Sequence, residues 1–457
     1  MSDDTGLFAG VLARGPVADA VSDRGWVAAM LDVEAALARA GATAGLIPPS
    51  AAEAIGAACQ SGDFDAAALG AQAAVSGNPV VPLVSALTRV VPPDAAGYVH
   101  LGATSQDILD TAAMLVADRA LGHLEVDLDA TTDSLAQLAD EHRTTLLPGR
   151  TLLQHALPAT FGLIAAGWLS GLAEAATRLG QIRRTRLAVQ LGGAAGTLAS
   201  LGNDGTKVTA LLANELGLAD PILPWHTDRT RVAELAGALG VAAGAIAKIA
   251  KDIVLLAQTE VAEVRERGPE GSGGSSTLPQ KQNPIAAICA VANARQAPGL
   301  VATLLAAMDH EHQRAAGAWH AEWRPLSELL RAAGSAAAWL RESLDRLEVD
   351  RTRMRANVDL LGDLLLAERV SAALAPHLGR VAAHEVVANA CAEAAASGRA
   401  LAHLVADRVA TARPDLREVF ATEELNRLLE PADYLGSSQV FIDRAVQAYR
   451  SRDRDGV

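Results

Sequence analysis

The residues best suited to chemistry lie in one glycine-rich stretch, which reads GSGGSSTLPQKQNP over positions 271–284. Two adjacent hydroxyls, Ser275 and Ser276, stand a few residues before the cation of Lys281. Asn283 is a preferred helix N-cap and the proline after it a preferred first helical residue, so a helix start is predicted there. Its free N–H groups, together with Lys281, would hold a carboxylate or phosphate. This combination suits removal of a proton next to a carboxylate, which needs a base and stabilisation of an anionic intermediate.

The glycine–serine run has a simpler interpretation, because such runs taken alone are typical of flexible linkers. A linker rarely ends in a helix-capping pair with a lysine two residues upstream. We therefore favour a ligand site over a linker for 271–284.

A second polar segment, YVHLGATSQDILDT (98–111), carries Thr104, Ser105 and Asp107 just before a long apolar-spaced run. Asp107 or Ser105 would cap the helix expected there, so helix capping and ligand binding are alternatives for these side chains. The residues alone do not separate the two.

A third segment, GRTLLQHALPATFG (149–162), offers Gln154 and His155, although a lone histidine is more often structural than catalytic.

Other residues have the side chains of metal ligands: Asp309, His310, Glu311, His312, His320 and Glu322. Their spacing is neither HExxH nor one helical face of carboxylates and histidines, so solvated or hydrogen-bonding roles are expected. We predict no metal and no organic cofactor.

These motifs resemble the fumarase/aspartase superfamily, which includes argininosuccinate and adenylosuccinate lyases. Its signature loop, GSS-x-[ML]-P-x-K-x-N-P, is present with Leu278 where Met is usual. The segments PWHTDRTRVAEL (224–235) and EHQRAAGAWHAEW (311–323) resemble a narrower group, the bacterial 3-carboxy-cis,cis-muconate cycloisomerases. The likeness runs from the N-terminus to nearly the end of the chain.

The resemblance implies roles for individual residues. Ser275 occupies the position of the catalytic base, and His155 that of the general acid or of a group that polarises the acid. Lys281 and Asn283 would hold the activating carboxylate. The other substrate-binding residues implied are Asn78, Thr104, Ser105, Gln154, Ser276 and Arg314. The superfamily assembles each site from three subunits of a homotetramer.

The reaction implied is proton transfer next to a carboxylate of a small polycarboxylate, here lactonisation of 3-carboxy-cis,cis-muconate in aromatic degradation, the β-ketoadipate pathway. An alternative is a lyase that releases fumarate by eliminating an amine or nitrite from a substituted succinate, for example nitrosuccinate. A catalytically silent scaffold is a third hypothesis. Gln280 and Gln282 replace the basic side chains of the usual PHKRNP loop, which bears on the substrate. Leu152 stands where many superfamily members carry histidine.

The amino-acid composition indicates which kind of secondary structure must position these residues. Half of the 457 residues are hydrophobic but only 3% are aromatic, which favours helices packed through Ala, Leu and Val. A net charge of −14 disfavours nucleic-acid and anionic-membrane partners. Three scattered cysteines and an N-terminus without signal-peptide features predict a soluble protein of the reducing cytoplasm.

Proline-free, alanine-rich intervals predict an all-α fold with three helical domains. We expect an N-terminal helical domain over 1–104, a central long-helix bundle over 105–348 that contains the loop 271–284, and a C-terminal helical domain over 349–457. Apolar spacing over 230–265 predicts a single helix roughly 54 Å long. A helix of that length suits a bundle core shared between subunits, and the family resemblance implies that these form a homotetramer.

Overall fold

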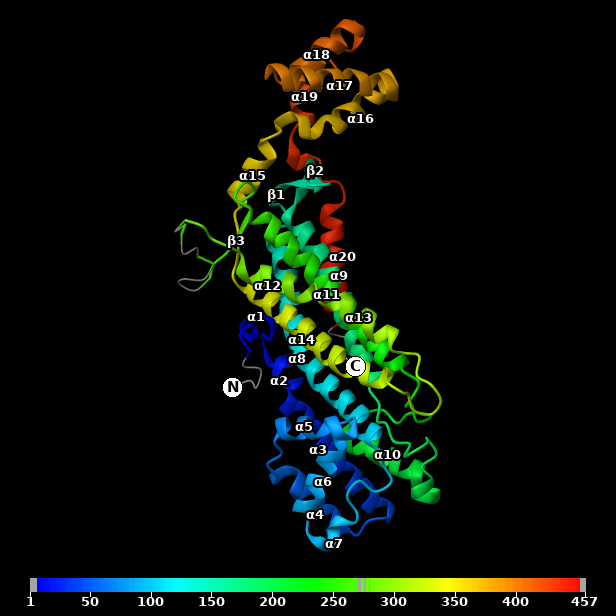
Figure 1. Cartoon of the computed structure of the whole chain (residues 1–457). Helices are drawn as coiled ribbons and strands as arrows, with labels where there is room; N and C mark the ends of the chain where they lie inside the picture. The colour runs from blue at the N-terminus through cyan, green and yellow to red at the C-terminus, as the bar shows by residue number, and fades with distance from the viewer. Residues whose placement is uncertain (1–5, 269–272, 275–276, 279, 453–457) are drawn as a thin grey trace. The chain divides into compact units, whose positions relative to one another are not determined.

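The computed structural model describes residues 6–268, 273–274, 277–278 and 280–452. The regular structure of the described chain is helical apart from two small two-stranded antiparallel sheets, which confirms the predicted all-α class (Figure 1). It forms two compact units, each built from three separate stretches. Unit 1 comprises Met1–Thr131, Leu172–Lys251 and Ile285–Ser343, and unit 2 comprises Thr132–Gly171, Asp252–Pro284 and Leu344–Val457.

Most elements lie wholly within one unit or the other. Those of unit 1 are α1 (Ala9–Leu12), α2 (Pro16–Ala20), α3 (Asp23–Ala44), α4 (Pro49–Ser61), α5 (Ala66–Ser76), α6 (Val80–Val90), α7 (Pro93–Ala96), η1 (Ala199–Asp204), α10 (Gly205–Leu216), α12 (Ile285–Ala294) and α13 (Ala297–Ala306). Those of unit 2 are β1 (Leu146–Thr151), β2 (Gln154–Thr160), β3 (Val264–Glu266), β4 (Leu347–Val349), α15 (Arg351–Asp359), η2 (Gly362–Leu366), α16 (Ala367–Leu378), α17 (Arg380–Ser397), α18 (Leu401–Ala412), η3 (Pro414–Leu416), α19 (Thr422–Leu428), η4 (Pro431–Asp433) and α20 (Ser438–Arg452). Four long helices contribute residues to both units: α8 (Ser105–Glu141), α9 (Phe161–Thr185), α11 (Thr230–Leu256) and α14 (Ala318–Asp345).

Local sequence explains where the helices begin and end, as α3 illustrates. Ser22 is its N-cap, and the Ser22 Oγ accepts a hydrogen bond from the Gly25 N–H over 3.1 Å. The helix ends at Gly45, whose φ of 87° lies in the left-handed region that glycine adopts without a Cβ penalty. Within unit 1, α3 packs against α4 and α10, and its buried face is rich in alanine and leucine (Figure 1). Small side chains of this kind let helix axes approach closely.

The C-terminal part of unit 2 has a hydrophobic core of its own. Helix α17 packs against α16 and α18, and the core is centred on Val370, Leu374, Val387 and Val405 (Figure 1). Elsewhere in this unit, β1 pairs with β2 and β3 with β4, both antiparallel. The three-domain division predicted from the sequence remains a prediction beside the two units found here.

The prediction of one continuous helix over 230–265 is wrong in its length. Helix α11 ends at Leu256, and the chain then turns through Ala262, which has a φ of 51°, into β3. Two side chains of α15 hold this turn, since Arg353 and Asn357 both donate to the Val261 carbonyl, over 3.0 and 2.8 Å. These contacts satisfy backbone groups outside a helix, and apolar spacing does not reveal them.

One described helical segment, Ile285–Ala306, is long and apolar enough by composition to cross a membrane, and 39% of its most apolar window is buried. It comprises α12 and α13, which are separated at Arg295 and Gln296. Core helices of soluble proteins pass the same test of length and composition.

Candidate functional site

The predicted site residues divide between the two units. Four lie in unit 1: Asn78, Thr104, Ser105 and Arg314. Four lie in unit 2: Gln154, His155, Lys281 and Asn283. Ser275 and Ser276 lie outside the described residues.

The N-terminus of α8 brings a hydroxyl together with a cation from a distant part of the sequence. Thr104 directly precedes the helix, and Ser105 is its first residue. The Arg314 Nη1 donates a hydrogen bond to the Thr104 Oγ1 over 2.5 Å. Helix N-termini attract anions through their free N–H groups, and a guanidinium adds a charged donor. We call Thr104, Ser105 and Arg314 the carboxylate corner, because together they can bind one carboxylate group.

Asp107 caps α8, as one of the two sequence interpretations predicted. Its Oδ2 accepts from the Thr104 N–H over 2.9 Å, while the Asp107 N–H donates to the Thr104 carbonyl over 2.9 Å. The bond to the Asp107 carboxylate is one half of a capping box, whereas the Asp107 N–H bonds to the Thr104 carbonyl and not to its hydroxyl. The carboxylate is fully buried and also accepts from the Gly192 N–H and the Gly193 N–H, over 3.0 and 2.9 Å. The helix start is thereby fixed to the glycine-rich segment around residue 192.

The backbone before α8 takes unusual conformations. His100 has a φ of 63° and Gly102 a φ of 79°, and a Cβ at Gly102 would lie 2.4 Å from the Leu201 Cδ2. The His100 Nδ1 lies 2.6 Å from the Glu34 Oε1, and Glu34 is buried. Burial lowers the pKa of His100, but the hydrogen bond and charge of Glu34, with the charge of Asp107, raise it above its ordinary value.

Asn78 has a clear local function. Its Oδ1 accepts from the Val80 N–H and the Val81 N–H over 3.1 and 3.3 Å, at the start of α6. These two bonds satisfy free donors in the first turn of the helix. The predicted contact with substrate would use the remaining amide group of the side chain.

Gln154 and His155 begin β2, directly after a tight turn of the β1–β2 hairpin. The two turn residues, Leu152 and Leu153, have φ values of 51° and 66°. Positive φ at both positions is the pattern of a type I′ turn, which normally takes Asn-Gly. Both leucines are exposed, at 97% and 71%. The hairpin thus presents two apolar side chains, with Gln154 and His155 directly behind them.

A buried ion pair fixes the hairpin within unit 2. Arg150 pairs with His155 across the ladder and donates to both carboxylate oxygens of Glu263, over 2.7 and 2.9 Å. The Asn357 Nδ2 also donates to Glu263, over 2.8 Å. Burial and the positive charge of Arg150 lower the pKa of His155, and the more weakly acting charge of Glu263 opposes them. The pKa of His155 is therefore lowered, and the side chain becomes charged only at a lower pH than an ordinary histidine.

Two described residues of the signature loop, Gly273 and Asn283, are hydrogen-bonded to each other. The Asn283 N–H and the Asn283 Nδ2 both donate to the Gly273 carbonyl over 2.9 Å. Gly273 has a φ of 71°, and a Cβ there would lie 2.6 Å from the Asn283 carbonyl oxygen, so this position requires glycine. Lys281 is exposed. Helix α12 begins at Ile285, one residue later than the predicted start, a difference within the usual uncertainty of helix ends.

A buried ion cluster in unit 1 was not predicted. Arg229 donates to Asp110 over 2.8 and 3.1 Å and to Glu322 over distances from 2.5 to 3.1 Å. The Trp319 Nε1 donates to Asp110 over 3.0 Å. Burial lowers the pKa of Arg229, but the charges of Asp110 and Glu322 raise it well above its ordinary value. The cluster joins α8, the start of α11 and α14 within the unit. The sequence held one signal of this cluster: Arg229 is a charged residue at the edge of an apolar-spaced run, four residues after Trp225.

Glu322 thus has a hydrogen-bonding role in a segment that also contains histidines. In the described part of the chain, no group of three or more His, Cys, Asp or Glu side chains is arranged to hold a metal ion.

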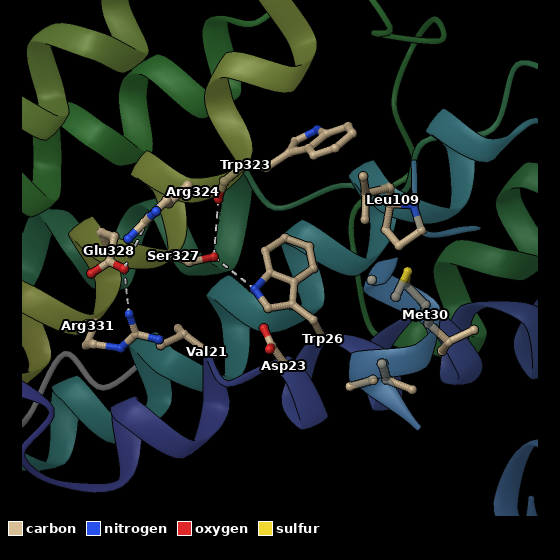
Figure 2. A pocket seen from close by; sticks show the side chains of 15 residues that line it. Val21, Asp23, Trp26, Met30, Leu109, Trp323, Arg324, Ser327, Glu328 and Arg331 are labelled. Atoms are coloured by element: carbon tan, nitrogen blue, oxygen red, sulfur yellow. Dashed lines mark hydrogen bonds and ion pairs between the residues drawn. The ribbon is translucent and has the colours of Figure 1, made fainter. Parts of the chain in front are cut away.

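A cavity of about 380 Å³ lies elsewhere in unit 1 (Figure 2). Trp26 forms one wall, and its Nε1 donates to the Ser327 Oγ over 2.9 Å. Arg331 and Glu328 pair over 2.8 Å at another side. Of the predicted site residues that the structure describes, none lines this cavity. It does not account for the predicted chemistry.

Comparisons with known proteins cover nearly the whole chain. A family described as lyase matches residues 13–299, and a family described as adenylosuccinate lyase C-terminus matches residues 363–445. A 3-carboxy-cis,cis-muconate cycloisomerase of Pseudomonas aeruginosa is 45% identical over 97% of this chain and 96% of its own length. A nitrosuccinate lyase of Streptomyces davaonensis is 46% identical over 97% of this chain and 94% of its own. The crystal structure of 3-carboxy-cis,cis-muconate lactonizing enzyme from Pseudomonas putida superposes with a TM-score of 0.89 at 44% identity, covering 97% of this chain and 99% of that one.

Proposed function

This chain is an enzyme of the fumarase/aspartase superfamily, and on that premise we propose that it closes 3-carboxy-cis,cis-muconate to a carboxymuconolactone without a cofactor. The family match and the cycloisomerase relatives support this substrate. This chain covers almost the full length of these relatives, so the similarity extends over the whole enzyme and is not confined to one domain.

The reaction is an internal addition. An oxygen of one substrate carboxylate bonds to a carbon of the double bond, and the electron pair moves toward the neighbouring carbon and its carboxylate. That carbon then receives a proton. In the proposed mechanism Ser275 delivers this proton during ring closure and is then reprotonated by the general acid, which takes its proton from solvent; during elimination Ser275 removes the proton. Lys281 and Asn283 hold the activating carboxylate, whose developing negative charge a cation stabilises.

The single observation that best supports a polycarboxylate substrate is the contact of Arg314 with Thr104. A guanidinium, a hydroxyl and a helix N-terminus meet where no carboxylate side chain of the protein pairs with Arg314 among the described contacts. In a chain with a net charge of −14, such local cations are needed to attract an anion. In this proposal the corner binds one substrate carboxylate, with Gln154, Asn78 and Ser276 as further contacts and His155 as the general acid.

The proposal includes a homotetramer whose sites combine residues of three subunits, in the cytoplasm. The exposed leucine tip of the β1–β2 hairpin, directly before Gln154 and His155, is consistent with burial against another subunit. The scattered free cysteines are consistent with a reducing compartment.

A second candidate is nitrosuccinate cleavage to fumarate and nitrite. The nitrosuccinate lyase relative is as similar as the cycloisomerases. Gln280 and Gln282 leave Lys281 as the only cation between Thr277 and Pro284, where the usual cycloisomerase loop has more basic side chains. A substrate with two carboxylates needs fewer cations than one with three.

An ultraviolet absorbance assay on the purified protein separates these functions. Loss of 3-carboxy-cis,cis-muconate supports the cycloisomerase, and appearance of fumarate from nitrosuccinate supports the lyase. Turnover of nitrosuccinate alone would overturn the first proposal, and inactivity on both substrates would leave the scaffold hypothesis.

A further inference from the structure

His226 precedes α11 and has a buried imidazole that no part of the proposed chemistry uses. Its Nε2 lies 2.7 Å from the Asp107 Oδ1. An ionised carboxylate oxygen only accepts hydrogen bonds, so the imidazole carries its proton on Nε2 and donates it to Asp107. The fit is close, because a Cβ on Gly192 would lie 2.8 Å from the His226 Cε1. The imidazole therefore has little room to change its orientation.

Asp107 transmits this contact to the carboxylate corner. Its Oδ1 takes the His226 donor, and its Oδ2 accepts from the Thr104 N–H over 2.9 Å. Thr104 directly precedes α8, and the bond from its N–H to Asp107 fixes the position of its backbone. Loss of the imidazole would leave the carboxylate with four of its five donors and let it shift toward them, and the Thr104 backbone would move with it.

The backbone of His226 reaches the other half of the corner. Its carbonyl accepts from the Gln106 Nε2 over 2.8 Å and lies 3.3 Å from the His310 Nδ1, which must be the donor to a carbonyl. The His310 side chain is completely buried, and its Nε2 is 3.3 Å from the Glu322 Oε1. His310 is four residues before Arg314 in the segment between α13 and α14, so it anchors the chain that carries this guanidinium.

We infer that His226 is a positioning residue that sets both halves of the carboxylate corner: its imidazole, which a substitution removes, acts on Thr104 through Asp107, and its backbone carbonyl acts on Arg314 through His310. The inference rests on the proposed function for the identity of the corner as a carboxylate site. His226 does not touch the substrate. Its role is to hold a hydroxyl and a guanidinium, which are 210 positions apart in sequence, in a fixed mutual geometry.

Steady-state kinetics on the full-length protein test this, with 3-carboxy-cis,cis-muconate or nitrosuccinate as substrate. His226→Leu should raise KM about tenfold or more and change kcat by less than about threefold. His226→Gln retains an amide donor near the position of Nε2, so its KM should return to within about threefold of wild type. The KM of the double variant His226→Leu/Thr104→Val should rise by less than the product of the two single-variant effects, because Thr104→Val already removes the hydroxyl that His226 positions through Asp107.

His142 provides the matched control. It is also buried and has a side-chain contact, with the Thr145 Oγ1 over 3.1 Å, but it lies in unit 2. His142→Leu should lower the urea midpoint while KM stays within about twofold of wild type. Equal KM changes in the two leucine variants, no rescue by His226→Gln, or multiplicative effects in the double variant would each overturn the inference. If His226→Leu does not fold, His310→Leu tests the Arg314 branch with the same criteria.

Fumarate binding, measured by titration calorimetry, separates this inference from the proposed function. A wild type that is inactive on both substrates contradicts the proposed function, yet weaker fumarate binding by His226→Leu than by His226→Gln would still support the positioning role. Equal fumarate affinities in the two variants, or no binding by the wild type, would overturn it.

Discussion

Asp107→Asn should destabilise the protein far more than a change of one atom suggests. The buried carboxylate accepts five hydrogen bonds, with Gly192, Gln190 and His226 at Oδ1 and Thr104 and Gly193 at Oδ2. An asparagine has one carbonyl oxygen and one NH2 group, and the NH2 group donates where the wild type accepts. Whichever way the amide is turned, at least two donors lose their acceptor.

The magnitude follows from the better of the two amide orientations. With the amide oxygen at the Oδ1 position, the Thr104 N–H and the Gly193 N–H are left buried without an acceptor. Each such group costs about 1–3 kcal/mol, so the two together cost about 2–6 kcal/mol. The three remaining bonds also weaken, because they no longer reach a charged acceptor. This is a large part of the roughly 5–15 kcal/mol that separates folded from unfolded proteins.

The measurement is the free energy of unfolding in urea, followed by far-ultraviolet circular dichroism at a fixed protein concentration. Asp118→Asn is the control, because Asp118 also binds an arginine, Arg183 over 2.9 Å, but both side chains are about one third exposed. That change should cost less than about 1 kcal/mol. A loss below about 1 kcal/mol for Asp107→Asn would refute the reasoning that its carboxylate is an essential multiple acceptor.

Three further predictions concern titration and the hairpin. Because Glu34 raises the pKa of His100, the stability that His100 contributes is complete below about pH 6.5 and is lost as pH rises through the raised folded value. The free energies of unfolding of wild type and His100→Gln, measured in urea at a series of pH values, should therefore converge as pH rises above the ordinary histidine range, and a constant difference would contradict this. Replacing Leu152 and Leu153 by Asn-Gly removes the backbone strain of two left-handed leucines, about 1–2 kcal/mol, so the urea midpoint of the dissociated subunit should rise; an unchanged subunit midpoint would count against backbone strain, and a loss of assembly would show that the leucines are buried between subunits. If His155 is the general acid, kcat/KM should fall as pH rises through a value below 6.5, and this limb should be missing in His155→Gln.

Local patterns predicted much of this molecule. Alanine-rich, proline-free intervals indicated an all-α chain, and the Asn283-Pro284 pair placed the start of α12 to within one residue. Capping chemistry also identified Asp107 as one of two residues able to cap α8, and Asp107, the third residue of the helix, accepts from the Thr104 N–H before it. These successes share a cause, since each depends on residues within one helical turn of each other.

Contacts between distant residues could not be predicted in this way. Arg229 meets Asp110 and Glu322 across 119 and 93 positions, and no periodicity in one segment identifies such partners. The end of α11 was missed because side chains of α15 hold the turn around Val261. The predicted site residues also fall in separate units, so the roles assigned to them still depend on the family resemblance and on experiment.

The most direct test of the central claim is the rate of 3-carboxy-cis,cis-muconate loss with Ser275→Ala beside Ser272→Ala, a change in the same glycine–serine run. If Ser275 carries the proton, its variant should lose about 10²–10⁴-fold in kcat, which is the usual contribution of a general acid or base. The Ser272→Ala variant should keep nearly wild-type activity. A Ser275→Ala enzyme that turns over within about threefold of wild type would contradict the account.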